Sequence, residues 1–171
     1  MTEATRSNEN AATQSTTAER EIVITRVLNA PRELVWQAWT DPAHIAQWWG
    51  PKGFSAKVPE LDLRSGGRWR YIMIGPDGAE YPSEGVFREV VPFERIVTTD
   101  EFGDDFQPPE GMDLPRGIVV TCLFEDLDDK TRLTLRIAHP TVEDRRKHEA
   151  MGVVAGWNSS LDCLEEELAT M

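Results

Sequence analysis

The chain has 171 residues, of which 40% are hydrophobic, so it is long enough for one domain with a real core. Its 30 acidic and 18 basic residues give a net charge of −12, which excludes nucleic acid as the expected partner because such a surface repels phosphate. There is no membrane-length apolar run and no secretory signal pattern, so we expect a cytoplasmic protein without a membrane span.

The first 18 residues are polar or small, and Met1 is their only large apolar side chain. Such a segment cannot bury enough surface to offset the entropy lost on ordering. We therefore predict a disordered tail over residues 1–18 and a single domain over residues 19–171.

The folded part begins with a predicted strand and two short helices. Residues 21–28 are rich in β-branched side chains, which favours a strand. Pro31 suits the first turn of a helix, and Asp41 with Pro42 marks the start of a second helix that Gly50 ends. The apolar stripes of these helices are Leu34, Val35, Ala38 and Trp39, then Ile45, Trp48 and Trp49.

Six further strands are predicted at close spacing, over residues 54–63, 67–74, 80–91, 95–102, 118–125 and 131–138. Short connections between consecutive strands indicate an antiparallel sheet. Residues 103–116 interrupt the pattern with three prolines, two glycines and four acidic side chains. We interpret this loop either as a lid over a binding site or as a variable surface excursion.

The C-terminal segment, residues 141–171, has no proline and predicts one long amphipathic helix with Thr141 as its N-cap. Its apolar stripe is Met151, Val154, Trp157, Leu161, Leu164 and Leu168. The acidic run 165–167 is unfavourable at a helix C-terminus. A long helix after a series of strands must bury its stripe against the sheet, so we predict an α+β fold with a cavity between helix and curved sheet.

Candidate binding residues follow from the third strand, where period two places Trp69, Tyr71 and Met73 on one face and Arg68 and Arg70 on the other. Facing the long helix, the aromatic set would line a pocket, although plain core packing explains each residue as well. The predicted ligand-binding residues are Trp48, Trp69, Tyr71, Met73, Phe87 and Phe102 on the sheet side, with Met151, Val154, Ala155 and Asn158 on the helix side.

We expect neither a metal nor a cofactor. The histidines, His44, His139 and His148, are isolated in sequence, and we expect His44 and His148 to face solvent. No zinc-binding spacing, nucleophile elbow or phosphate-binding loop occurs. Cys122 and Cys163 lack partners at metal-site spacing, which predicts reduced thiols.

As a set, several motifs resemble one family. They are Ala30-Pro31 with Val35-Trp36, Thr40-Asp41-Pro42, Trp48-Trp49-Gly50-Pro51, Gly66-Gly67-Arg68-Trp69, Gly75-Pro76-Asp77-Gly78, Pro92 with Glu94-Arg95-Ile96, Thr131-Arg132-Leu133-Thr134-Leu135 and Gly156-Trp157. The chain resembles proteins of the helix-grip (Bet v 1-like, START-related, SRPBCC) superfamily, and within it the domain named for the activator of Hsp90 ATPase (AHSA1). The resemblance implies a curved sheet of about seven strands around a long C-terminal helix, with hydrophobic small molecules held between them.

Three functions are compatible with this resemblance. The first is a binder of a hydrophobic, aromatic or lipid-like molecule. The second is an enzyme of the cyclase, aromatase or hydrolase type, with polar groups drawn from Tyr71, Glu89, Asp100 and Asn158. The third is an interaction module for an Hsp90-type chaperone. The oligomeric state stays open, and a homodimer through the sheet edge is compatible with each function.

Overall fold

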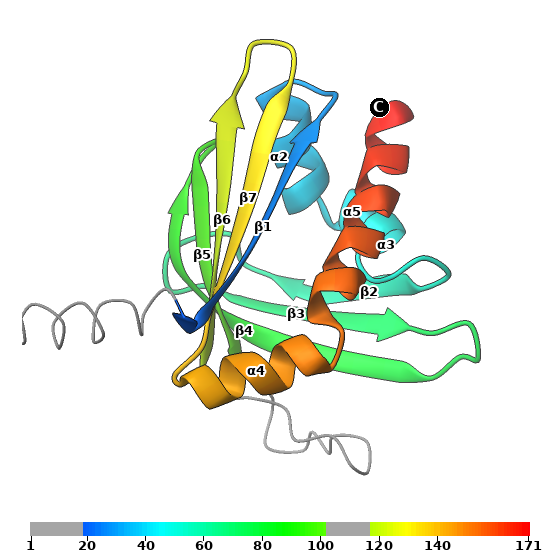
Figure 1. The fold of residues 1–171 in the computed structure, drawn as a ribbon. Helices are drawn as coiled ribbons and strands as arrows, with labels where there is room; N and C mark the ends of the chain where they lie inside the picture. Colours follow the sequence, from blue (N-terminus) through cyan, green and yellow to red (C-terminus); the bar gives the residue numbers. More distant parts are fainter. Residues whose placement is uncertain (1–18, 102–116) are drawn as a thin grey trace, which may run out of the picture.

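The computed structural model describes residues 19–101 and 117–171, so the predicted tail and the 103–116 loop lie outside the described residues. Seven described strands form one antiparallel sheet in the order β1-β7-β6-β5-β4-β3-β2. The sheet curves, and α5 lies on its concave side (Figure 1). The predicted α+β helix-grip architecture is therefore confirmed.

The strands follow the prediction closely. Their bounds are β1 Glu21–Leu28, β2 Ser55–Leu61, β3 Arg68–Ile74, β4 Glu80–Val91, β5 Arg95–Glu101, β6 Ile118–Asp126 and β7 Thr131–Ala138. Chain-consecutive strands pair from β2 to β7, while β1 closes the order by pairing with β7 from Glu21 opposite Ala138 to Leu28 opposite Thr131. The register of β4 against β5 shifts between Phe87 and Glu89, an irregularity of the kind that bends a sheet.

Two short helices connect β1 to β2, as predicted. They are α2 (Arg32–Thr40) and α3 (Pro42–Trp48). Asp41 caps α3 because its side chain accepts a hydrogen bond from the Ala43 amide at 2.9 Å. The indole Nε1 of Trp48 donates to the Ala38 carbonyl at 2.8 Å, so a buried donor joins the two helices.

The C-terminal segment differs from the prediction of one continuous helix. It forms α4 (Val142–Ala150) and α5 (Val153–Ala169), which are separated at Met151 and Gly152. Gly152 has a left-handed backbone with φ of 86°, which ends a helix and which glycine adopts without a steric penalty. Thr141 caps α4 as expected, by accepting a hydrogen bond from the Asp144 amide at 3.0 Å.

The core lies where the C-terminal half of α5 meets β1, α2 and α3. Leu161 and Leu164 of α5 are at most 1% exposed, as are Leu133 and Leu135 of β7. Full burial of leucine side chains is worth about 1.5–3 kcal/mol each before cavity effects. This half of the interface between α5 and the sheet is therefore solidly packed.

Each residue of the acidic run near the end of α5 lies close to a basic or histidine side chain from another element. Glu167 lies 3.2 Å from His44, and Glu165 and Glu166 lie 3.9 Å and 4.0 Å from Arg26 and Lys52. The pairs with Arg26 and Lys52 are long and at least partly exposed, so they offset only a small part of the unfavourable interaction with the helix dipole. His44 is part-buried against Glu167, which corrects the expectation that it faces solvent.

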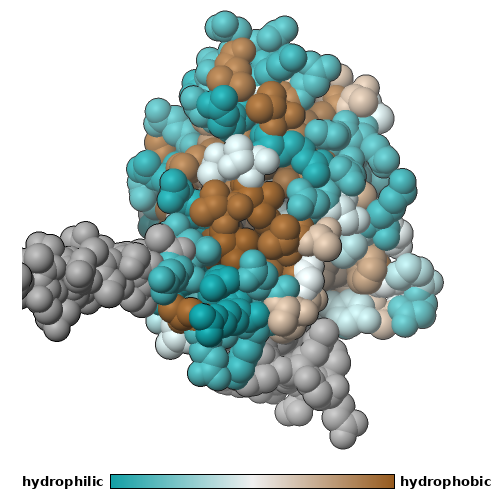
Figure 2. Space-filling view, in the orientation of Figure 1, coloured by the Kyte–Doolittle hydropathy of each residue, from teal (hydrophilic) through white to brown (hydrophobic). Residues whose placement is uncertain are grey.

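The surface is largely hydrophilic, and Figure 2 shows an apolar area at the centre of the face drawn, framed by hydrophilic side chains. Val23 and Val27 on β1 are 52% and 47% exposed. Of the helices described, none combines the length and the apolar character that crossing a membrane requires.

Candidate ligand cavity

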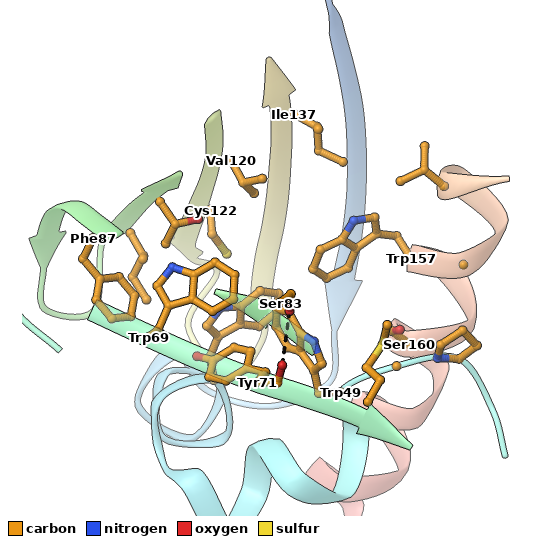
Figure 3. Close-up of a pocket in the computed structure, with 18 of the residues that line it drawn as sticks. Trp49, Trp69, Tyr71, Ser83, Phe87, Val120, Cys122, Ile137, Trp157 and Ser160 are labelled. Carbon is orange, nitrogen blue, oxygen red and sulfur yellow. Dashed lines mark hydrogen bonds between the residues drawn. The ribbon is translucent and has the colours of Figure 1, made fainter. Parts of the chain in front are cut away.

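A cavity of about 310 Å³ lies between the concave face of the sheet and the N-terminal half of α5. Its wall draws on five strands, the corner after α3, and helices α2, α4 and α5. The lining residues are Trp39, Trp49, Gly50, Pro51, Leu63, Trp69, Tyr71, Met73, Ser83, Phe87, Ile96, Thr98, Val120, Cys122, Ile137, His148, Val153, Gly156, Trp157 and Ser160. Figure 3 shows the labelled side chains of the sheet opposite Trp157 and Ser160 of α5.

The sheet wall follows the period of two that the sequence predicts. Trp69, Tyr71 and Met73 line the cavity, whereas Arg68 and Arg70 are exposed on the opposite face of β3. Neighbouring strands contribute alternate residues in the same way, such as Val120 and Cys122 of β6. The structure therefore separates the two sets of β3 side chains in the way that a period of two predicts.

Gly85 makes room for the Trp69 indole. A Cβ atom at Gly85 would lie 2.7 Å from Cζ2 of Trp69 and 1.7 Å from the Thr99 carbonyl oxygen. Only glycine fits between the two strands and the ring. Among the described residues, Nε1 of Trp69 has no hydrogen-bond partner, so the cavity wall contains a buried polar group that is not compensated.

The helix wall is displaced from the predicted one. Val153, Gly156, Trp157 and Ser160 line the cavity, whereas Val154, Ala155 and Asn158 do not. The break at Gly152 separates Met151 from the rest of the predicted stripe, whose members Trp157, Leu161, Leu164 and Leu168 lie on the inward face of α5. Met151 is 37% exposed and lies outside the lining.

Asn158 holds α5 to the edge strand β1. Nη2 of Arg26 donates to both the backbone and the side-chain oxygen of Asn158 at 3.2 Å. Nη1 of the same guanidinium lies 2.6 Å from Asp162. The side-chain oxygen of Asn158, which the sequence suggested as an orienting group for a ligand, therefore accepts a hydrogen bond from Arg26 instead.

Two further predicted lining residues are placed elsewhere. Trp48 is 1% exposed and packs behind the cavity wall, where its ring lies 4.7 Å from Trp39 and 5.3 Å from Trp49, measured between ring centroids. Phe102 lies outside the described residues. The ring that reaches the cavity from the corner after α3 is Trp49 rather than Trp48.

Of the four polar groups considered for an enzyme, Tyr71 is the one that lines the cavity. Burial raises the pKa of Tyr71 well above its usual value, so the phenol stays protonated. Glu89 forms an ion pair with Arg95 instead, and the side chain of Asp100 lies outside the described part of the chain.

The cavity chemistry includes a thiol but no metal cluster. Cys122 is buried, and desolvation raises the pKa of its thiol. Within residues 19–101 and 117–171, no group of three His, Cys, Asp or Glu is arranged to hold a metal ion. Cys122 and Cys163 are both free thiols.

A pair of histidines at the cavity was missed by sequence reasoning. Nε2 of His139 lies 2.8 Å from Nδ1 of His148, and His148 belongs to the cavity lining. This contact corrects the expectations that the histidines are isolated and that His148 faces solvent. The two residues come from the end of β7 and from α4, and no sequence spacing signals a contact that tertiary packing creates.

Together, the curved antiparallel sheet, the C-terminal helix and the cavity between them define a domain of the helix-grip class. The chain belongs to the family described as activator of Hsp90 ATPase homolog 1-like protein, whose profile matches residues 29–169. No curated protein matches the chain at a significant level.

Solved bacterial structures share this fold. Protein NE0264 from Nitrosomonas europaea is 30% identical, with a TM-score of 0.75 over 90% of this chain and 96% of its own. Protein Ms6760 from Mycobacterium smegmatis is 28% identical, with a TM-score of 0.77 over 90% of this chain and 94% of its own. The AHSA1 protein from Silicibacter pomeroyi is 27% identical, with a TM-score of 0.66 over 88% of this chain and 98% of its own.

Proposed function

We propose that this chain binds an apolar small molecule, aromatic or lipid-like, between the sheet and the N-terminal half of α5. The observation that carries the proposal is the cavity of about 310 Å³ between the sheet and α5, next to the packed core formed by the C-terminal half of that helix. Ligand pockets usually measure about 300–1,000 Å³ and combine an apolar wall with a few polar groups. Both properties describe this cavity.

The aromatic wall supports an aromatic ligand. Four tryptophans, Trp39, Trp49, Trp69 and Trp157, line the cavity together with Tyr71. Trp39 and Trp157 are parallel, with an interplanar angle of 2° and ring centroids 6.2 Å apart. Flat rings can offer a ligand both apolar area and stacking geometry, at about 25 cal/mol per Å² of apolar surface removed from water.

Gly156 provides a direct test because a Cβ atom placed there meets no other group within 4 Å. A large side chain at this lining position therefore extends into open space. We expect Gly156→Phe to fill the cavity and to weaken binding of the neutral fluorescent probe N-phenyl-1-naphthylamine by at least about tenfold. The matched control, Gly156→Ala, adds one methyl group and should bind like the wild type.

The measurement is a fluorescence titration of the wild type and the two variants, with circular dichroism to verify folding. Equal probe affinity in all three folded proteins would contradict the proposal, as would the absence of saturable binding to the wild type. In either case the family resemblance would favour the chaperone alternative. Measuring the ATPase rate of a bacterial Hsp90 with added protein would then be the next experiment.

A further inference from the structure

The pair His139–His148 joins the end of β7 to α4 at the edge of the cavity. The ring centroids are 5.1 Å apart with an interplanar angle of 71°, and the two nitrogens lie 2.8 Å apart. His139 is 4% exposed. His148 is part-buried, and the proton arrangement of the pair can be deduced from the remaining hydrogen-bond partners of the two rings.

The Arg20 carbonyl sets the tautomer of His139. Nδ1 of His139 lies 2.7 Å from the Arg20 carbonyl oxygen. A carbonyl oxygen can only accept, so Nδ1 of His139 carries a hydrogen, and in the neutral ring Nε2 is then an acceptor. The backbone amide of His139 also donates to this carbonyl at 3.0 Å, so two hydrogen bonds fix the His139 ring relative to the Arg20 carbonyl.

The tautomer of His148 follows from that of His139. Since Nε2 of the neutral His139 ring accepts, Nδ1 of His148 must donate across the 2.8 Å contact. Nε2 of His148 is then left as a hydrogen-bond acceptor. Among the described residues, the side-chain hydrogen bond of His148 is the one through Nδ1, which leaves Nε2 without a partner there, and His148 belongs to the cavity lining.

The surroundings hold His148 in place and keep it uncharged. Arg145 on the same helix donates from Nε to the Glu19 carbonyl at 2.7 Å, and Arg20 donates to the Pro140 carbonyl at 3.1 Å, so the segment before β1 fastens α4. Burial, together with the adjacent His139, lowers the pKa of His148 to about 4. At neutral pH the ring therefore presents a lone pair.

We propose that Nε2 of His148 accepts a hydrogen bond from a hydroxyl group of the ligand, and that the cavity therefore selects phenols or alcohols over their O-methyl ethers. His139 acts as a positioning residue that fixes the tautomer of His148. This assignment rests on the proposed function, because it concerns a ligand in the same cavity. It narrows the ligand class from apolar molecules to apolar molecules with one hydroxyl donor.

The matched pair 2-naphthol and 2-methoxynaphthalene tests the selection by isothermal titration calorimetry. One net hydrogen bond corresponds to about three- to tenfold in affinity. We expect the ratio of the two affinities to fall by that factor in His148→Leu compared with the wild type, mainly through loss of naphthol binding. The control His44→Leu removes a histidine that contacts Glu167 away from the cavity, and it should leave the ratio unchanged.

An unchanged ratio in His148→Leu, with both probes still bound, would overturn the assignment and leave the proposed function intact. Failure of the wild type to bind either probe would contradict both. A second measurement needs no ligand: long-range ¹H–¹⁵N NMR correlations of the wild type at neutral pH. We expect both rings as Nδ1–H tautomers, with the His148 ¹⁵N signals shifted in His139→Gln. A hydrogen on Nε2 of His148 would overturn the assignment whichever probes bind.

Discussion

The two halves of α5 lie over the same sheet but differ in how closely they pack. Its C-terminal half presents Leu161, Leu164 and Leu168, which close against β1, α2 and α3 with almost no exposed surface. Its N-terminal half presents Gly156, Trp157 and Ser160 to a cavity of about 310 Å³. One helix therefore anchors the fold with one half and lines a cavity with the other.

The largest expected effect is a difference in stability between truncations in the packed core and truncations at the cavity wall. Leu164→Ala should lower the free energy of unfolding by about 2–5 kcal/mol, because a fully buried leucine leaves a void that its packed neighbours cannot fill. Met73→Ala, a similar truncation on the cavity wall, should cost about 1 kcal/mol, because part of that side chain already faces empty space. Urea denaturation of both variants measures the difference. Equal losses of unfolding free energy would contradict the distinction between the half of α5 that packs closely and the half that lines the cavity.

A smaller effect is the pH dependence of stability that His148, at the cavity, contributes. Its pKa is lowered to about 4 in the folded state, below the ordinary value of about 6.5, so the unfolded chain binds a proton that the folded chain does not. The stability from this group is present above about pH 6.5 and is lost as the pH falls towards 4. The ring is partly exposed, so we expect a loss of only about 1 kcal/mol after screening.

The variant His148→Leu isolates this contribution, because the other titrating groups are common to both proteins. Urea denaturation between pH 7 and pH 4 should show a flatter decline in stability for His148→Leu than for the wild type. Parallel declines would indicate that His148 is solvated at the cavity edge and titrates normally.

The smallest expected effect is a gain in stability. Gly156→Ala replaces a glycine inside α5, where the new Cβ atom meets no group within 4 Å, so we expect about 0.5–1 kcal/mol of added stability from helix propensity. Gly85→Ala provides the contrast, because its Cβ atom would collide with the Thr99 carbonyl and the Trp69 ring. Thermal melting measures both changes. A destabilised Gly156→Ala protein would mean that this wall of the cavity is tighter than its geometry indicates.

Sequence reasoning recovered the elements whose signals are local. The limits of β1, β4 and β7 agree with the prediction because alternating side chains and turn residues bracket each strand. The separation of Trp69, Tyr71 and Met73 from Arg68 and Arg70 on β3 also follows from period two, and the aromatic character of the first set suggested that it faces the cavity. These features depend on neighbouring residues in the chain and therefore appear in the sequence.

The features that were missed depend on a backbone choice or on contacts between elements. The sequence contains Gly152, but it does not reveal the left-handed backbone conformation that separates α4 from α5 there, nor that Val153 rather than Val154 lines the cavity. The contact between His139 and His148 arises because α4 folds back over the end of β7. The residues that bind a ligand stay a prediction until binding is measured.

The most direct test of the central claim is native mass spectrometry of the wild type and Gly156→Phe, each purified from the natural host and then denatured to release bound molecules. We predict one apolar small molecule per wild-type chain, carrying a hydroxyl group, and none on folded Gly156→Phe. An empty wild type, or the same molecule at the same stoichiometry on both proteins, would contradict the claim that the cavity beside the N-terminal half of α5 is the binding site.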